Sequence, residues 1–123
     1  MMTAITDNTM TNHLGLFTST GEVKVDETVK FLETSKRELA KAFGFSPDQL
    51  RPDRMSVRVK DKIKELSATL EFVAESFNGD IEKTLFWFNT PNPAFGGAIP
   101  KSLILRGRYK KVMAFILASR SGR

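Results

Sequence analysis

The feature of this chain that most constrains its fold is a long apolar repeat between Ser56 and Phe77. Successive apolar residues are separated alternately by four and three positions in the series Val59, Ile63, Leu66, Leu70, Val73 and Phe77. This is the period of an α-helix with one buried face. We therefore predict one long amphipathic helix. Its apolar face either packs into the core of its own chain, which we favour, or pairs with a second copy as in a coiled coil.

Shorter helical segments are expected on both sides of this helix, and no stretch keeps the period of two that marks a strand. The predicted fold is therefore all-α, a small helical bundle. Residues 1–21 are rich in Thr, Asn and Ser and show no apolar period, so we expect them to be disordered or loosely ordered. Residues 22–77 then form a first helical unit, and residues 78–123 form a second.

Residues 39–46 indicate a helix-turn-helix corner. Ala40 is the small residue that lets two helices cross closely, and Gly44 supplies the turn four positions later. Pro52 interrupts the second helix, which is then short for a helix that presents several side chains to base edges. The candidate DNA-binding residues are Lys36, Arg37, Ser46, Gln49, Arg51 and Arg54. Two interpretations stay open: retained DNA binding, or a scaffold whose basic residues are merely exposed.

A second informative segment runs from Trp87 to Pro100 and contains three aromatic residues, three prolines and two adjacent glycines. Proline fixes φ and pushes the preceding residue out of the helical region, whereas glycine permits positive φ. We therefore predict a rigid loop with apolar anchors, a kind of loop that often carries recognition. Phe88 is expected in the core, and Phe95 and residues 91–93 are expected at the surface.

Together with residues 101–112, this loop resembles the toxin-binding domain of Xre/MbcA/ParS-type antitoxins. The family pattern is a Trp, the string TPNPxLGGxxP, an apolar pair, a Gly and a Val-led amphipathic helix, and the resemblance covers about a third of the chain. This chain departs from the pattern at three positions. Phe95 replaces the usual Leu, Ile99 replaces a common helix-capping Thr, and Arg108 replaces a frequent acidic residue.

The resemblance implies a function that the residues alone do not give. Members of this family neutralise toxins of the RES-domain class, enzymes that consume NAD or transfer parts of it as in ADP-ribosylation. They often carry an Xre-like helix-turn-helix before the toxin-binding domain, so residues 22–77 become a degenerate helix-turn-helix half and residues 78–123 a toxin-binding domain with a C-terminal tail. The implied toxin-binding residues are Trp87, Thr90, Pro91, Asn92, Pro93, Phe95, Gly96, Gly97, Pro100, Tyr109, Arg120 and Arg123.

The resemblance also implies a mechanism and partners. In this family the C-terminal helix and tail approach the NAD pocket of the toxin, so residues 119–123 are expected to block the active site. Their short basic sequence suits a pocket that binds pyrophosphate or acidic groups. A homodimer and a higher toxin–antitoxin assembly are expected, with operator DNA as a further partner in autoregulation. The alternative interpretation is a helix-turn-helix transcriptional regulator without a toxin partner.

Composition argues against several other functions. The chain has no cysteine and one histidine, His13, which leaves few residues for thiolate metal sites or histidine-based catalysis. It also lacks phosphate-binding or dinucleotide glycine motifs and an evident acid–base carboxylate pair, so we expect no enzyme activity, cofactor or metal. No apolar run approaches the ~20 residues of a membrane span, and the N-terminus lacks a signal-peptide layout. A cytoplasmic location is therefore expected.

Charge is distributed unevenly along the chain, whose formal net charge is +5. Residues 101–123 contain seven Lys and Arg residues and no Asp or Glu, whereas the preceding residues are slightly acidic in sum. Such a segment suggests an acidic partner or a polyanion. The alternative is a solvated basic face that only aids solubility.

Overall fold

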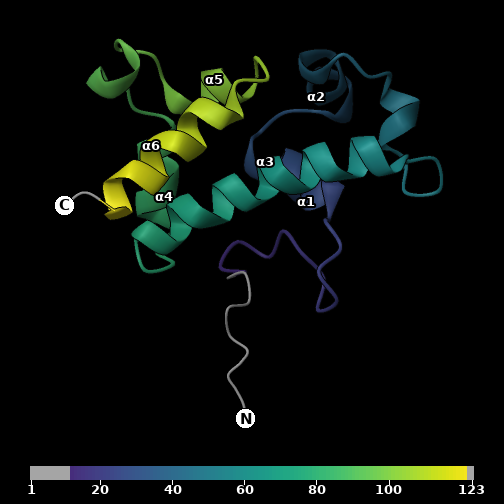
Figure 1. Ribbon diagram of the computed structural model, residues 1–123, viewed down its shortest axis with the longest axis horizontal. Coiled ribbons are helices and arrows are strands. Elements are labelled where there is room, and N and C mark those ends of the chain that lie inside the picture. Colours follow the sequence, from purple (N-terminus) through teal and green to yellow (C-terminus); the bar gives the residue numbers. More distant parts are fainter. Residues whose placement is uncertain (1–11, 122–123) are drawn as a thin grey trace.

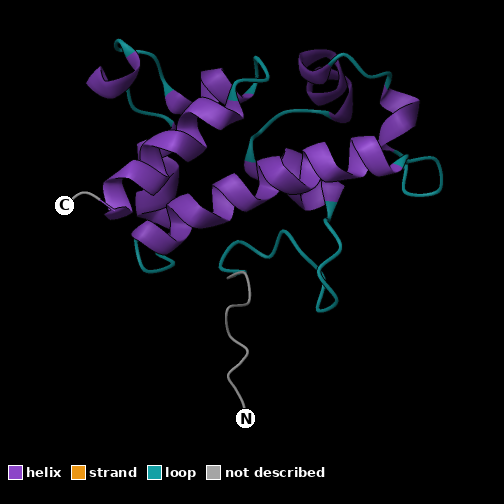
Figure 2. Cartoon of the chain, viewed as in Figure 1, coloured by secondary structure: helices purple, strands orange, loops and turns teal. Residues whose placement is uncertain are grey.

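The computed structural model describes residues 12–121, which are mostly helical and contain no strand (Figure 1, Figure 2). The all-α prediction is confirmed. None of the helices in this range is long and apolar enough to cross a membrane. The elements in chain order are α1 Val25–Phe31, α2 Lys36–Phe43, the short 3-10 helix η1 Pro47–Leu50, α3 Val57–Ser76, α4 Ile81–Phe88, the 3-10 helix η2 Pro93–Phe95, α5 Pro100–Ile104 and α6 Tyr109–Ser121.

The long helix α3 is the spine of the molecule, with α1 and α2 beside one end and α4 and α6 beside the other (Figure 1). Ser56 caps this helix, because its hydroxyl accepts a hydrogen bond from the Val59 N–H at 3.2 Å. The predicted apolar face is confirmed. Its buried members are each at most 1% exposed, and they are Val59, Ile63, Leu66, Leu70 and Val73. This face therefore closes the core of a single chain and is not free to pair with a second copy.

Helix α6 packs along α3 and closes the other half of the core. Val112 and Ile116 are buried in this contact, and the Tyr109 phenol donates a hydrogen bond to the Glu65 carboxylate. Burial and the neighbouring Glu65 raise the pKa of Tyr109, so the phenol stays protonated and acts as a donor. Phe88 of α4 is buried, as predicted.

The corner between α5 and α6 rests on α2. Gly107 adopts a φ of 79°, and a Cβ at this position would lie 2.7 Å from the carbonyl oxygen of Ala42. The rings of Phe43 and Tyr109 meet beside it, with their centroids 5.7 Å apart. The segments 22–77 and 78–123 are therefore packed against each other both along α3 and at this corner.

Residues 12–21 differ from the expectation of loose order. Leu16 and Phe17 are only 1% and 5% exposed, and Phe17 forms an isolated bridge with Val23. Two adjacent apolar residues are too few to produce a period, which is why the sequence pattern did not indicate their burial. Residues 1–11, which the same expectation included, lie outside the described part of the chain.

A buried carboxylate on α3 holds this N-terminal segment. The Glu71 side chain is fully buried and accepts hydrogen bonds from the backbone N–H groups of Leu14 and Leu16 at 3.1–3.2 Å. Burial raises the pKa of Glu71, and the two backbone hydrogen bonds oppose that rise. Glu71 is thus a buried ionisable group with a structural partner, because it satisfies two N–H groups that would otherwise be unpaired.

Candidate functional site

Hydrogen bonds converging on Asn92 hold the loop between α4 and α5. The Asn92 N–H donates to the Ala98 carbonyl at 3.0 Å, and the Asn92 carbonyl accepts from the N–H groups of Phe95 and Gly97 at 2.9 and 3.0 Å. Its side-chain oxygen also accepts from the Ala94 N–H at 2.9 Å. The loop therefore has the closed, rigid form that its proline and glycine content predicted.

The glycine pair in this loop is required by the backbone. Gly96 and Gly97 have φ values of 67° and 88°, and a Cβ at either position would meet no atom within 4 Å. Positive φ, rather than lack of space, thus favours glycine at both positions. Of the other predicted contact residues, Pro91 and Pro93 are exposed, and the partly buried Thr90 donates its hydroxyl hydrogen to a backbone carbonyl of α4.

A cluster of aromatic rings fastens the loop to the helices below it. The ring centroids of Phe95 and Phe115 are 5.2 Å apart, and Trp87 lies 6.2 Å from Phe95 and 6.3 Å from Phe115. Phe95 therefore differs from the expectation of a surface residue, since it is partly buried and anchors the loop on α4 and α6. Phe115, which the sequence analysis did not single out, completes the cluster from α6.

An apolar groove of about 560 Å³ lies between the end of α3, helix α4 and this loop. We call it the Phe86 groove, because the Phe86 side chain in its wall is 71% exposed. Sequence analysis did not place Phe86 among the site residues. Helix spacing could have indicated its exposure. Thr84 and Phe88 on the buried face of α4 are each two positions from Phe86, and residues two apart do not share a helix face. The groove is lined by Phe77, Glu82, Lys83, Phe86, Trp87, Thr90, Pro91 and Asn92.

The predicted toxin-contact residues on α5 and α6 have different surroundings. Pro100 and Tyr109 are buried, so they support the surface from below. Ile99 precedes α5 without a side-chain cap, as its departure from the family pattern predicted. Pro100 is the first residue of α5, where its missing N–H costs no hydrogen bond.

Arg120 differs from the expectation that residues 119–123 form a C-terminal tail. It belongs to α6, and its guanidinium lies 4.9 Å from the ring centroid of Phe72. It donates to the Phe72 carbonyl at 2.9 Å and forms an ion pair with Glu75 at 3.1 Å. Arg120 is therefore attached to α3, because three groups of that helix hold it. Arg123 lies outside the described residues.

The helix-turn-helix corner has its first helix and turn but only a fragment of the second helix. Ser35 caps α2 by accepting from the Glu38 N–H at 3.1 Å, and Gly44 ends it with a φ of 77°. Where a recognition helix would follow, η1 is a single 3-10 turn of four residues. Such a turn cannot place several side chains along a major groove in the way that an α-helix does.

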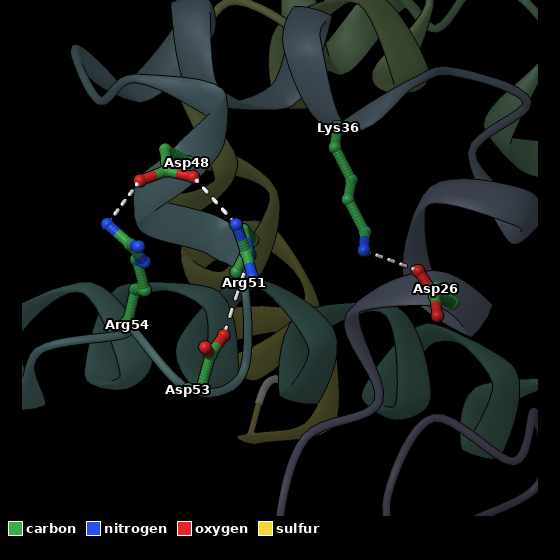
Figure 3. Close-up of polar contacts among 6 residues, drawn as sticks. All are labelled: Asp26, Lys36, Asp48, Arg51, Asp53 and Arg54. Carbon is green, nitrogen blue, oxygen red and sulfur yellow. Dashed lines mark hydrogen bonds and ion pairs between the residues drawn. The ribbon is translucent and has the colours of Figure 1, made fainter.

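Local partners occupy most of the candidate DNA-binding residues (Figure 3). Lys36 pairs with Asp26 at 2.8 Å, Arg51 with Asp48 and Asp53 at 3.4 and 3.5 Å, and Arg54 with Asp48 at 3.1 Å. The Ser46 N–H donates to the Gln49 side chain at 2.8 Å, and Arg37 is exposed on α2. Neighbouring aspartates thus offset much of the positive charge on this surface.

Residues 73–122 match the family model described as the antitoxin Xre/MbcA/ParS C-terminal toxin-binding domain. The match confirms the resemblance inferred from the sequence and supports an antitoxin of this type. It begins near the end of α3 and includes α4, the loop around Asn92, α5 and α6. It therefore contains every residue that lines the Phe86 groove. The comparisons with curated proteins and with solved structures gave no match.

Proposed function

We propose that this chain is the antitoxin of a type II toxin–antitoxin pair and that it neutralises a RES-domain toxin by blocking the active site. The toxin is an enzyme that consumes NAD or transfers ADP-ribose. The observation that carries the proposal is the coincidence of the family match with an exposed apolar groove beside a rigid loop. Rigid aromatic groups in such a setting bind partners at low entropic cost.

The Phe86 groove is the surface that we assign to the toxin. The exposed Phe86 side chain adds little to the stability of the fold. Its burial by a partner would remove a large apolar side chain from water. Pro91 and Pro93, also exposed, extend this surface along the loop. Trp87 and Phe95 hold the loop in place underneath.

The C-terminal end of α6 is the part that we assign to the toxin's pocket. Arg120 is held by α3, and these contacts fix the C-terminal end of α6. The last two residues, 122–123, include Arg123, whose guanidinium suits a pocket for pyrophosphate or acidic groups.

Co-expression with the product of the adjacent reading frame tests the proposal. We expect growth rescue and a complex that co-purifies. Phe86→Ser should abolish rescue while leaving the antitoxin folded, because the side chain is exposed. Val57→Ser is the matched control, since Val57 is 75% exposed but lies at the far end of α3, outside the groove. If the wild-type chain neither rescues growth nor forms a complex, the proposal is wrong for that neighbour.

Active-site blocking needs a separate variant. A chain that ends at Ser121 keeps the Arg120 contacts and removes only residues 122–123. We expect it to co-purify with the toxin but to inhibit NAD turnover less completely than the full chain. Full inhibition by the shortened chain would show that these two residues do not block the pocket.

A regulator without a toxin partner is the alternative, and the structure gives it less support. The recognition helix is reduced to η1, and the cations beside it are paired with aspartates. Autoregulation would therefore depend on the assembled toxin–antitoxin complex or on another basic surface. Binding of the isolated chain to a duplex of its upstream region, followed across salt concentrations, separates sequence-specific binding from phosphate contacts alone.

A further inference from the structure

A second hollow adjoins the same loop on the side of α5 and α6. It has a volume of about 610 Å³, and we call it the basic cleft. Phe95 and Phe115 form its apolar part, with ring centroids 5.2 Å apart, and Ala114 contributes from α6. Arg106, Arg108 and Lys111 also line it. Its lining residues come from the loop that contains η2, from α5 and the turn after it, and from α6.

The cations of the basic cleft differ from the other basic residues of the same segment. Lys101 pairs with Glu33 at 2.8 Å, and Arg120 pairs with Glu75 at 3.1 Å. Within the described residues, Arg106, Arg108 and Lys111 form no ion pair. All three are exposed, and no acidic residue follows Glu82 in the chain. Their charges are therefore available to a partner.

The positions of two of these cations, Arg108 and Lys111, do not favour the fold. Arg108 directly precedes α6 and Lys111 lies in its first turn, which contains no acidic residue. The N-terminus of a helix carries partial positive charge, so cations there are unfavourable. A partner that supplies negative charge at this point would remove the repulsion.

The apolar part of the cleft indicates what kind of partner fits. Protein interfaces combine aromatic residues at the centre with arginines, and their rims are polar. A duplex nucleic acid would engage the cations through phosphates but would leave the rings of Phe95 and Phe115 without an apolar partner. Aromatic rings and cations in one cleft therefore favour a protein segment that has both apolar and acidic side chains.

We propose that the basic cleft receives an acidic segment of the toxin. An apolar side chain of that segment packs on Phe95 and Phe115, and its carboxylates pair with Arg106, Arg108 and Lys111. This inference rests on the proposed function and assigns a second contact, separate from the Phe86 groove.

The test compares two triple variants that each remove three positive charges. The cleft variant removes the three cations that line the basic cleft and combines Arg106→Gln, Arg108→Gln and Lys111→Gln. The matched control removes paired cations from the helix-turn-helix half and combines Lys36→Gln, Arg51→Gln and Arg54→Gln. Binding to the product of the adjacent reading frame is measured at several salt concentrations. We expect the cleft variant to bind about tenfold more weakly with a shallower salt dependence, and the control to bind within about twofold of the wild-type chain.

Ala114→Trp provides an independent variant, because it fills the cleft and keeps every charge. Ala114 is exposed, so the fold should tolerate the larger side chain. We expect a loss of affinity comparable to that of the triple cleft variant. Thermal unfolding of all variants, monitored by circular dichroism, verifies that the comparison is made between folded proteins.

Each outcome separates the inference from the proposed function. If the wild-type chain binds the toxin and both cleft variants bind it equally well, the inference is wrong and the proposed function stands. If the wild-type chain does not bind, the proposed function fails and the inference fails with it. A duplex of about 20 base pairs is the second probe. If the cleft variants lose affinity only for this duplex, the cleft is a nucleic-acid site and the inference is wrong.

Discussion

Two basic surfaces of this chain contain the same residue types in opposite surroundings. In the helix-turn-helix half, Lys36, Arg51 and Arg54 pair with aspartates at 2.8–3.5 Å. In the basic cleft, the cations form no ion pair with a described residue and lie beside aromatic rings. The number of cations in a segment therefore does not identify a binding surface, because neighbouring acidic residues decide whether the charge is available.

The helices that form both surfaces are built around α3. The largest loss of stability is therefore expected from a substitution in the buried face of α3. Leu66→Ala leaves a cavity at a fully buried position, so we expect the free energy of unfolding to fall by about 2–5 kcal/mol. Urea unfolding should show one transition by circular dichroism and by fluorescence of Trp87, the single tryptophan. Two separate transitions would show that the surfaces belong to independent units. Val57→Ala is the exposed control, with an expected change within about 0.5 kcal/mol.

The next largest loss of stability is expected at the corner between α5 and α6, which contacts α2. Gly107→Ala strains a positive φ and places a Cβ 2.7 Å from the Ala42 carbonyl oxygen, so we expect a loss of about 2–4 kcal/mol. Gly96→Ala is the matched control, because its φ is also positive but its Cβ would meet no atom within 4 Å. We expect about 1 kcal/mol there. If thermal unfolding shows equal losses of stability for Gly107→Ala and Gly96→Ala, the close approach of Gly107 to α2 adds no cost.

A pH effect is expected where α3 holds the N-terminal segment. Burial raises the pKa of Glu71 above its ordinary value of 4.5, so the folded state binds this proton more tightly than the unfolded state. The contribution of Glu71 to stability is then fullest below pH 4.5 and declines as the pH rises through its folded-state pKa. The stability advantage of the wild-type chain over Glu71→Gln should therefore shrink from acidic to neutral pH. A constant or growing advantage in denaturant unfolding would contradict this direction.

The smallest change in stability is expected for a substitution that tests directly whether neighbouring aspartates mask the cations of the helix-turn-helix half. Asp48→Asn frees Arg51 and Arg54 from their shared partner, and exposed ion pairs contribute little, so stability should change by less than about 0.5 kcal/mol. Retention on heparin should nevertheless increase. Asp61→Asn is the control, since it changes the net charge equally and Asp61 is exposed on α3 without an ion pair among the described residues. Equal retention of the two variants would show that Asp48 does not mask the arginines.

The fold was largely predictable because periodicity and helix caps are local signals. The α3 repeat, the Ser35 and Ser56 caps and the Gly44 turn each rest on residues that are close in sequence. The rigidity of the loop was predictable for the same reason, since proline and glycine act on their own backbone.

The surroundings of the site residues were not predictable because they depend on distant partners. Arg120 is held by Phe72 and Glu75 on another helix, and the ring of Phe95 packs against Phe115 of α6. The pairing of Lys36 with Asp26 likewise joins two helices. A sequence pattern gives the type and the spacing of such residues but not their neighbours in space.

Hydrogen–deuterium exchange of the chain, alone and in complex with the product of the adjacent reading frame, tests the central claim most directly. We predict that the complex slows exchange in residues 81–98, around the Phe86 groove, and at the start of α6 beside the basic cleft. Exchange in residues 36–54 should stay unchanged. Protection confined to residues 36–54, with α4 and α6 exchanging as in the free chain, would contradict the assignment of toxin binding to the C-terminal half.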